Sequence, residues 1–276
     1  MPMKSALKRS KSFGYQTSDE YVRILSVLDS DLSPDHQTLV RRALESPNTL
    51  VMTQVMEIVT IICSKATQKS SNCHPMAKMA MNIIDRDSGN TFIDSLVTCL
   101  REWFNERDKL LRHSSITRWT AYVSFVTELY LNIRCKHRHV KLLIANIDQD
   151  NDDNELQQFL VAKQFRSLAV LLYDCCQSII ASLAVSPSPT VDVECLQSVL
   201  RTVGRFMEED NSSRMQQLMI SIRDVFINAQ RYKLTSMSQK SLLEVIEFRA
   251  SKWQFSLSQQ LYYFPYTKSV LELKND

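Results

Sequence analysis

The amino-acid sequence predicts an all-α protein, in which about ten antiparallel helices stack as a HEAT-like helical-repeat crescent. Three observations support this fold class. The 276 residues include only three glycines, Gly14, Gly89 and Gly204, where average usage of about 7% would give roughly nineteen. Apolar residues recur with the 3.6-residue spacing of amphipathic helices, and helix pairs recur roughly every 40 residues, the period of HEAT-type repeats. A chain so poor in glycine can hardly form a many-stranded sandwich, a dinucleotide fold or a phosphate-binding loop.

Four helices are predicted in the N-terminal third. The first begins at Ser18 as its N-cap, and a short second helix follows Ser33-Pro34, because proline suits the first helical turn. The third covers about 49–65, and the fourth begins near Pro75. Their apolar stripes are Tyr21, Ile24, Leu25 and Leu28; Leu39, Val40 and Leu44; Val51, Val55, Val59 and Ile62; and Met76, Ala80, Ile83 and Ile84.

Three longer helices are predicted in the middle of the chain. They run from Asn90 to about 112, from Ser115 to about 135, and over 155–184. No proline lies between 76 and 186, so nothing in this stretch forces a break. The stripes are Ile93, Leu96, Leu100, Trp103 and Phe104; Trp119, Tyr122, Val123, Val126, Leu129, Tyr130 and Ile133; and Phe165, Leu168, Leu172, Cys175, Ile179 and Leu183.

Three more helices complete the predicted array. Thr190 or Asp192 is the expected N-cap of the first, Asn211 or Ser212 caps the second, and the third covers about 238–252. Their stripes are Val193, Leu196, Val199, Leu200, Val203 and Phe206; Met215, Leu218, Met219, Ile222 and Phe226; and Leu242, Val245, Ile246 and Arg249.

The segments outside these helices set the expected domain boundaries. Residues 1–16 are basic and lack apolar periodicity, so we expect a disordered tail. Residues 17–255 form the single helical-repeat domain, with 136–154 as a loop between two helices. Residues 256–276 continue an aromatic tail that is too apolar to remain in solvent, so we expect it to pack on the domain, on a partner or on a second copy in a homodimer.

Charge and cysteine content bear on partners and compartment. The net charge is +3, and residues 1–18 carry four basic and no acidic residues, so the rest of the chain is nearly neutral. A nearly neutral body argues against nucleic acid as the main partner. Seven scattered cysteines do not form a disulfide framework and indicate a reducing compartment, cytoplasmic and nuclear. The N-terminus lacks the apolar stretch of a signal peptide, and no apolar run is long enough to span a membrane.

Two clusters resemble metal sites, but each departs from the required pattern. Asp148, Asp150 and Asp152 have the spacing of an EF-hand loop, yet Asp153 stands where glycine is needed and Phe159 where a bidentate glutamate is needed. The segment Cys135-Lys-His-Arg-His lacks a second ligand pair at the spacing of a zinc site. We therefore expect no metal and no cofactor.

The motifs of common catalytic sites are also missing from the sequence. There is no G-x-S-x-G, no phosphate-binding P-loop and no H-E-x-x-H. Cys175 and Cys176 lie on a predicted apolar stripe, where a cysteine acts as a small hydrophobic residue. We expect a protein that is not an enzyme.

Basic residues gather around two predicted inter-helix turns. If these turns share one edge of the crescent, they form a stripe that could contact phosphates. The alternative interpretation is an ordinary solvated surface. The candidate residues for binding RNA or a partner are Arg112, His113, Arg118, Arg134, Lys136, Arg138 and Lys141.

Three segments resemble the middle domain of eukaryotic translation initiation factor 4 gamma. Phe125-Val-Thr-Glu-Leu-Tyr is similar to an F-x-x-E-L-[FY] helix of that domain, and Asn211-Ser-Ser-Arg-Met-Gln-Gln-Leu-Met is similar to a later one. Leu243-Glu-Val-Ile-Glu-Phe-Arg-Ala-Ser-Lys-Trp resembles the small stand-alone members, above all the one that binds the histone-mRNA stem-loop-binding protein. The similarity covers roughly 20–255.

The resemblance implies a HEAT-like scaffold in messenger-RNA translation. The implied function is a non-catalytic adaptor that bridges an mRNA-bound protein, such as the histone-mRNA stem-loop-binding protein, to translation initiation factors or a DEAD-box helicase. The alternative is an RNA-binding module that uses the basic 101–141 region. Most of the matching residues are expected to be core, and Glu128 and Arg214 are expected to form ion pairs or caps. The expected core residues are Phe125, Leu129, Met215, Leu218, Ile246 and Phe248.

Overall fold

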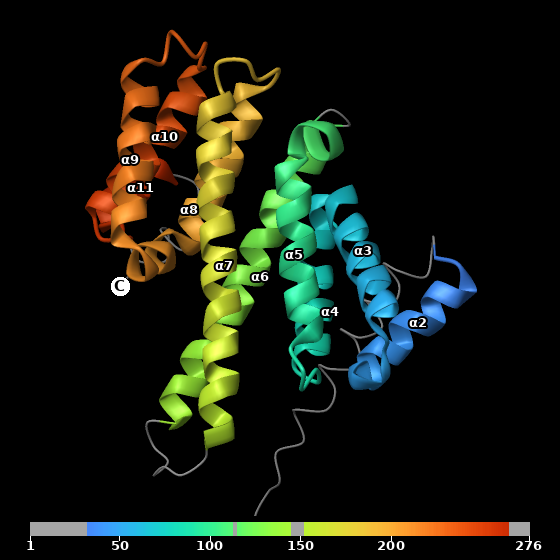
Figure 1. Ribbon diagram of the computed structural model, residues 1–276. Helices are drawn as coiled ribbons and strands as arrows, with labels where there is room; N and C mark the ends of the chain where they lie inside the picture. The colour runs from blue at the N-terminus through green and yellow to red at the C-terminus, as the bar shows by residue number, and fades with distance from the viewer. Residues whose placement is uncertain (1–31, 113–114, 145–151, 265–276) are drawn as a thin grey trace, which may run out of the picture.

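The computed structural model describes residues 32–112, 115–144 and 152–264, and these residues form an all-helical array without strands (Figure 1). The all-α helical-repeat prediction is confirmed. The helices are α2 (Pro34–Glu45), α3 (Met52–Gln68), α4 (Cys73–Ile84), α5 (Thr91–Asn105), α6 (Ile116–Ile144), α7 (Asp152–Ser182), α8 (Pro189–Asp210), α9 (Ser212–Ile227), α10 (Ser236–Ala250) and α11 (Leu257–Tyr263).

The helices stack in two layers. One layer is built by contacts of α3 with α5, α5 with α7 and α7 with α9; the other by contacts of α4 with α6, α6 with α8 and α8 with α10. Figure 1 shows the succession from α2 at one end to α10 and α11 at the other. The apolar stripes meet between the layers and form one continuous core, as expected when each helix pair covers its neighbour.

Helix caps explain where several elements begin. The hydroxyl of Ser33 accepts a hydrogen bond from the His36 amide at the start of α2, and the side chain of Asn211 accepts one from the Arg214 amide at the start of α9. The expected caps of α8, Thr190 and Asp192, are wrong. That helix begins at Pro189, with Ser188 as N-cap, because proline fits the first position of a helix.

The 136–154 loop is wrong over most of its length. Helix α6 continues to Ile144 and α7 begins at Asp152, so the two ends extend below the body as a helical hairpin (Figure 1). Residues 136–144 are polar and basic at first but contain no proline or glycine, and polarity alone does not end a helix. Asp148 and Asp150, which share the EF-hand spacing with Asp152, lie outside the described part.

Helix α5 is shorter than predicted. It ends at Asn105, and a π-helical turn over Asp108–Arg112 follows before α6. Leu111 is buried in this turn and the Arg107 guanidinium donates to the Ser178 hydroxyl at 2.9 Å. Tertiary contacts therefore bend the chain where its apolar spacing would have continued a helix. The helix predicted from Ser18 and the 1–16 tail lie outside the described residues.

Candidate partner-binding surfaces

The predicted basic residues form two groups rather than one stripe. Arg112 ends the π-helical turn before α6 and Arg118 lies in the first turn of α6, whereas Arg134 and Lys136 lie toward the other end of that helix. At 1.5 Å per residue, the roughly twenty residues between the groups separate them by about 30 Å. Consecutive turns lie at opposite ends of the helix that joins them, as α6 shows in Figure 1. The single-stripe geometry is wrong for that reason.

The side chain of Arg112 is held in place by contacts with other residues of the protein. Its guanidinium lies 4.7 Å from the centre of the Trp119 ring and donates to the carbonyl and the hydroxyl of Ser178, each at 3.2 Å. Burial lowers the pKa of this guanidinium, while the charges of Asp192 and Asp108 act in the opposite direction. Arg118 lies 5.8 Å from the centre of the Trp103 ring. His113 lies outside the described residues.

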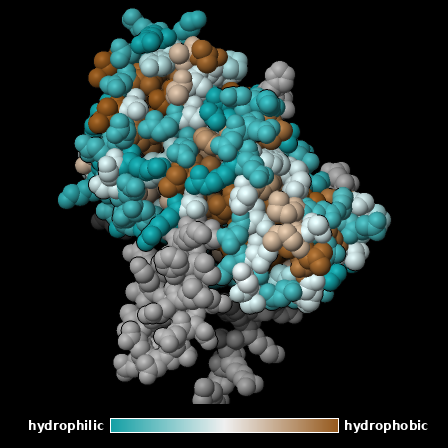
Figure 2. Space-filling view, viewed as in Figure 1, coloured by the Kyte–Doolittle hydropathy of each residue, from teal (hydrophilic) through white to brown (hydrophobic). Residues whose placement is uncertain are grey.

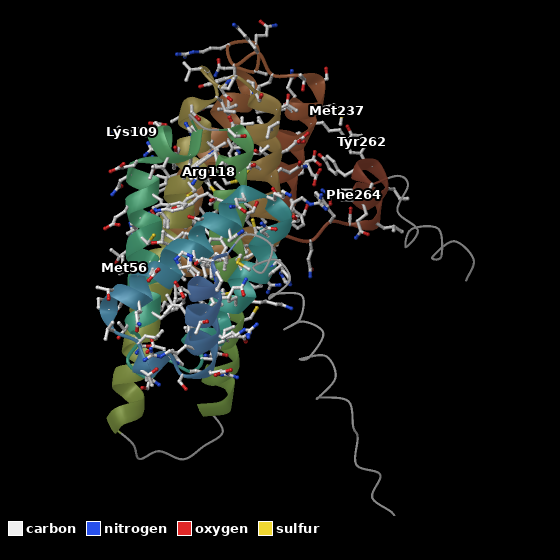
Figure 3. All side chains as sticks on the ribbon, turned by 90° about the vertical axis from the view of Figure 1, so that its right-hand side faces the viewer. Met56, Lys109, Arg118, Met237, Tyr262 and Phe264 are labelled. Atoms are coloured by element: carbon white, nitrogen blue, oxygen red, sulfur yellow. The ribbon has the colours of Figure 1, made fainter. Side chains whose placement is uncertain are left out.

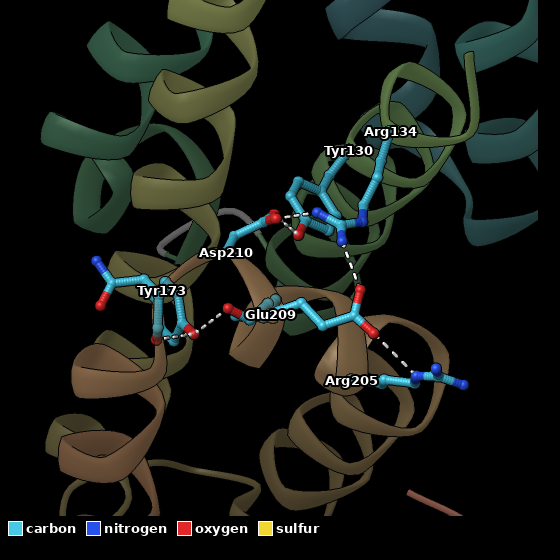
Figure 4. Close-up of polar contacts among 8 residues, drawn as sticks. Tyr130, Arg134, Tyr173, Arg205, Glu209 and Asp210 are labelled. Atoms are coloured by element: carbon cyan, nitrogen blue, oxygen red, sulfur yellow. Dashed lines mark hydrogen bonds and ion pairs between the residues drawn. The ribbon is translucent and has the colours of Figure 1, made fainter. Parts of the chain in front are cut away.

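The second group includes an arginine that ties α6 to α8 (Figure 4). Arg134 forms ion pairs with Asp210 and, at 2.7 Å, with Glu209; the hydroxyl of Tyr130 also donates to Asp210. Glu209 accepts a further bond at 3.0 Å from Arg205. Because only 16% of the Arg134 side chain is exposed, this network serves helix packing more than it serves a ligand.

Lys136, Arg138 and Lys141 complete the second group. Lys136 is half-exposed and pairs with Asp85 at the end of α4. Arg138 and Lys141 lie on the last turns of α6, and their side chains lie outside the described part. Arg112, Arg134 and Lys136 thus have structural roles that the charge pattern alone could not reveal.

Most residues of the three segments that resemble the family have the core or ion-pair roles expected for them. Phe125, Leu129, Met215 and Leu218 are buried, while Ile246 and Phe248 are partly buried against the core. Glu128 pairs with His74 at 2.9 Å, and Arg214 pairs with Asp174 at 3.6 Å. These residues are therefore structural within this chain.

A second candidate surface lies at the C-terminal end of the array, on α10 and α11. Met237 is 69% exposed and Tyr262 is 61% exposed, and Leu257 and Leu261 of α11 are also exposed. The ammonium group of Lys240 lies 5.3 Å from the centre of the Tyr262 ring, which joins the two helices. Figure 3 shows Met237 and Tyr262 on the same edge of the molecule. We call these four apolar side chains the α10–α11 surface.

The aromatic segment 253–263, which contains α11, also packs against the body of the protein. Trp253 is buried against Gly204 of α8, and its indole N–H donates to Glu208 at 2.7 Å. The Tyr263 hydroxyl donates to Glu247 of α10 at 2.9 Å. Sequence reasoning identified this segment as a packing element but did not separate its buried face from its exposed one, and it missed Met237. The 3.6-residue spacing of the apolar residues in 257–263 is the signal that could have distinguished the buried face of this segment from its exposed face. The domain boundaries themselves stay predictions.

The opposite face offers a contrast to the α10–α11 surface. Figure 2, in the view of Figure 1, shows a mainly hydrophilic face on which apolar residues are scattered in small groups. A shallow polar depression of about 380 Å³ lies elsewhere, on the side of α8 that faces α10, and is lined by Glu194, Gln197, Ser198, Arg201 and Thr202. Charged and amide groups on one helix can bind a polar partner but do not form a nucleophile–base arrangement.

The described residues offer neither a metal site nor a membrane-spanning helix. Within 32–112, 115–144 and 152–264, no three His, Cys, Asp or Glu side chains that the structure describes are close enough together to hold a metal ion. None of the helices in those ranges is long and apolar enough to cross a membrane. The side chains of His137 and His139, part of the zinc-like cluster, lie outside the described part.

Comparison with known proteins confirms the resemblance to the middle domain of eukaryotic translation initiation factor 4 gamma. The family model of the MIF4G domain matches residues 25–252. MIF4G domain-containing protein A of Danio rerio is 24% identical over 237 residues, which cover 84% of this chain and 94% of that protein. MIF4G domain-containing proteins of Bos taurus and Homo sapiens are 26% and 25% identical over 232 residues, covering 83% of this chain and 90% of each relative.

Proposed function

Because the chain belongs to the MIF4G domain family, we propose that it is a non-catalytic adaptor in mRNA translation. Domains of this family generally are helical scaffolds that mediate protein–protein contacts in translation and RNA processing. The adaptor would bridge an mRNA-bound protein, such as the histone-mRNA stem-loop-binding protein, to initiation factors or to a DEAD-box helicase. Its proposed sites of action are the cytoplasm and the nucleus, where these complexes assemble.

The observation that carries this proposal is the α10–α11 surface. Exposed apolar side chains that gather on adjacent helices mark protein-interaction sites, because each loses water-exposed area when a partner covers it. Met237 and Tyr262 are more than half exposed, although Tyr263, which follows Tyr262 in α11, is buried. A tyrosine of this kind supplies a large apolar area with a polar tip, the type of residue that dominates binding energy at interfaces.

Three of the basic residues already contact other groups of this chain, which favours protein over RNA as the main partner. Arg112 contacts Ser178 and Trp119, Arg134 pairs with two carboxylates, and Lys136 pairs with Asp85. A phosphate would have to displace these partners, and each displaced contact reduces the gain from binding. RNA contact remains the alternative that the experiment below separates.

A pull-down from RNase-treated cell extract tests the proposal. We expect the wild-type chain to recover at least one translation initiation factor, mRNA-bound translation protein or DEAD-box helicase. The double variant Met237→Ser/Tyr262→Ser should lose at least one of them. The matched control is Val51→Ser/Met52→Ser, two equally exposed apolar residues at the opposite end of the array, and it should recover the same proteins as the wild type.

Two outcomes would overturn the adaptor function. One is recovery of no such protein by the wild-type chain. The other is tight binding of purified RNA with a steep loss of affinity on raising the salt concentration, which indicates binding dominated by phosphates. In that case the RNA-binding module replaces the adaptor.

A further inference from the structure

A cavity of about 220 Å³ lies where α6 begins, α7 ends and α8 begins. It is far along the chain from the α10–α11 surface and shares no residue with it. Its apolar wall is formed by Ile116, Trp119, Val185 and Pro187. Val185 is 84% exposed, so the mouth of the cavity is bordered by an aliphatic side chain that solvent can reach.

The size of the cavity limits its ligand. Sites for cofactors and drug-sized molecules enclose about 300–1,000 Å³, more than this cavity offers. A volume of about 220 Å³ suits one aliphatic side chain together with the peptide groups that flank it. A ligand that fills the cavity would therefore be a single residue of a larger molecule rather than a whole cofactor.

Two polar groups in the wall define the chemistry of that residue. The Trp119 side chain is only 1% exposed, and its indole N–H has no hydrogen-bond partner among the described residues. A buried donor without a partner is costly and is rare in native proteins. A ligand that brings an acceptor oxygen to Trp119 would satisfy this donor.

The second group is the carboxylate of Asp192. It is buried at the start of α8 and accepts a bond of 2.6 Å from the Ser186 hydroxyl. A carboxylate can accept several hydrogen bonds, so Asp192 has capacity for another donor. With the cation of Arg112 in the same wall, the cavity holds both signs of charge, which disfavours a ligand that carries a net charge.

We infer that this cavity binds one aliphatic residue of an extended segment in a partner protein. A backbone carbonyl of the segment accepts from the Trp119 indole N–H, a backbone N–H donates to Asp192, and the side chain packs on Val185 and Pro187. A helical partner would not fit, because its backbone groups are already bonded within the helix. The inference rests on the proposed adaptor function and specifies one kind of partner segment.

An NMR titration with a minimal probe tests the inference on the full-length chain. The probe is N-acetyl-leucine N-methylamide, which carries one aliphatic side chain between two peptide groups. The chain has three tryptophans, so three indole N–H signals are expected, and the variant Trp119→Phe assigns the one from Trp119. We expect saturable movement of that signal in the millimolar range typical of so small a ligand, while the Trp103 and Trp253 signals stay in place.

A second probe and a matched pair of variants keep the test specific. The glycine analogue, which lacks the side chain, should bind at least about tenfold more weakly. Val185→Asp should abolish the movement, whereas Ile227→Asp, at a comparably exposed residue of α9, should not. Equal binding of both probes, equal binding by Val185→Asp, or no movement of the Trp119 signal would overturn the inference.

The titration contains no extract and does not involve the α10–α11 surface. A failure of the adaptor function therefore appears in the pull-down, and a failure of this cavity appears in the titration.

Discussion

Replacement of Gly204 by alanine should destabilise the protein although it improves helix propensity. Gly204 lies inside α8, where a Cβ atom would lie 2.3 Å from Cζ3 and 2.5 Å from Cη2 of Trp253. The Trp253 ring cannot simply turn away, because it is buried and its indole N–H donates to Glu208 at 2.7 Å. Either this bond or the packing of the ring on α8 must be lost.

Two opposing effects set the magnitude. Alanine is favoured over glycine inside a helix by about 1 kcal/mol. Overpacking a well-filled site costs about 1–3 kcal/mol, and loss of the bond to a charged group such as Glu208 costs about 1.5–3 kcal/mol. After subtraction of the gain in helix propensity, we expect a net loss of about 0.5–2 kcal/mol, which for a domain of this size lowers Tm by about 2–4 °C for each kcal/mol.

Urea unfolding in a double-mutant cycle is the assay. In the background Trp253→Leu the smaller side chain leaves room for a Cβ atom, so Gly204→Ala should become neutral or stabilising, by up to about 1 kcal/mol. Ser198→Ala, at an exposed residue of the same helix, is the control and should change stability little. A neutral or stabilising effect of Gly204→Ala in the wild-type background would refute the reasoning.

Three further predictions test separate parts of the structure. Arg134→Gln leaves two carboxylates of α8 without their cation and should lower the free energy of unfolding by about 1–3 kcal/mol. Lys136→Gln removes the cation of an exposed ion pair and should lower it by at most about 1 kcal/mol. Equal effects of the two variants in urea titrations would contradict this difference. Burial opposes ionisation of Glu208, but the hydrogen bonds from Arg249 and Trp253 outweigh it and hold its pKa below the ordinary value of 4.5. The stability it contributes is present above that value and is lost as the pH falls through the lowered pKa, so Glu208→Gln should reduce the loss of stability on acidification; an unchanged pH profile would argue against this role. Of the seven cysteines only Cys135 is exposed, so the native chain should react with a thiol reagent quickly at one site, and Cys135→Ser should remove that fast phase; several fast thiols would contradict the buried placement of the others.

The helices were predictable wherever one face is buried against the core. The stripe of α6 from Trp119 to Ile133 gives both the helix and its inward face, because the 3.6-residue period records which side is covered. The same period does not reveal where α6 ends, since the residues after Cys135 extend the helix beyond the core without an apolar stripe. Helix ends were predictable where a side chain caps them, as Ser33 and Asn211 do.

The use of glycine illustrates a different limit. Neither Gly89 nor Gly204 has a positive φ, and among the described residues the left-handed conformation is adopted by Asn90, Lys233, Lys252 and Trp253. Gly204 is needed because Trp253 approaches α8 closely. A contact between residues 49 positions apart depends on the tertiary fold, so the glycine count predicted the fold class without giving the reason for this residue.

The candidate sites were predictable only in part. Charge along the chain identified Arg112 and Arg134 as basic residues near turns, but it did not show that each is bonded to other protein groups. The aromatic residues near the C-terminus were visible in the sequence, whereas the cavity beside Trp119 depends on three helices meeting. Sites that combine distant segments emerge from packing and are not encoded in local spacing.

Tethering the chain to a reporter mRNA that lacks a poly(A) tail tests the adaptor function most directly. The measured quantity is reporter protein per mRNA molecule in cells, compared with the tether alone. The adaptor function predicts higher output for the wild-type chain and for Val51→Ser/Met52→Ser, and output no higher than that of the tether alone for Met237→Ser/Tyr262→Ser. Output from the wild-type chain that equals the tether alone, with the chain folded and bound to the reporter, would contradict a role as a translation adaptor.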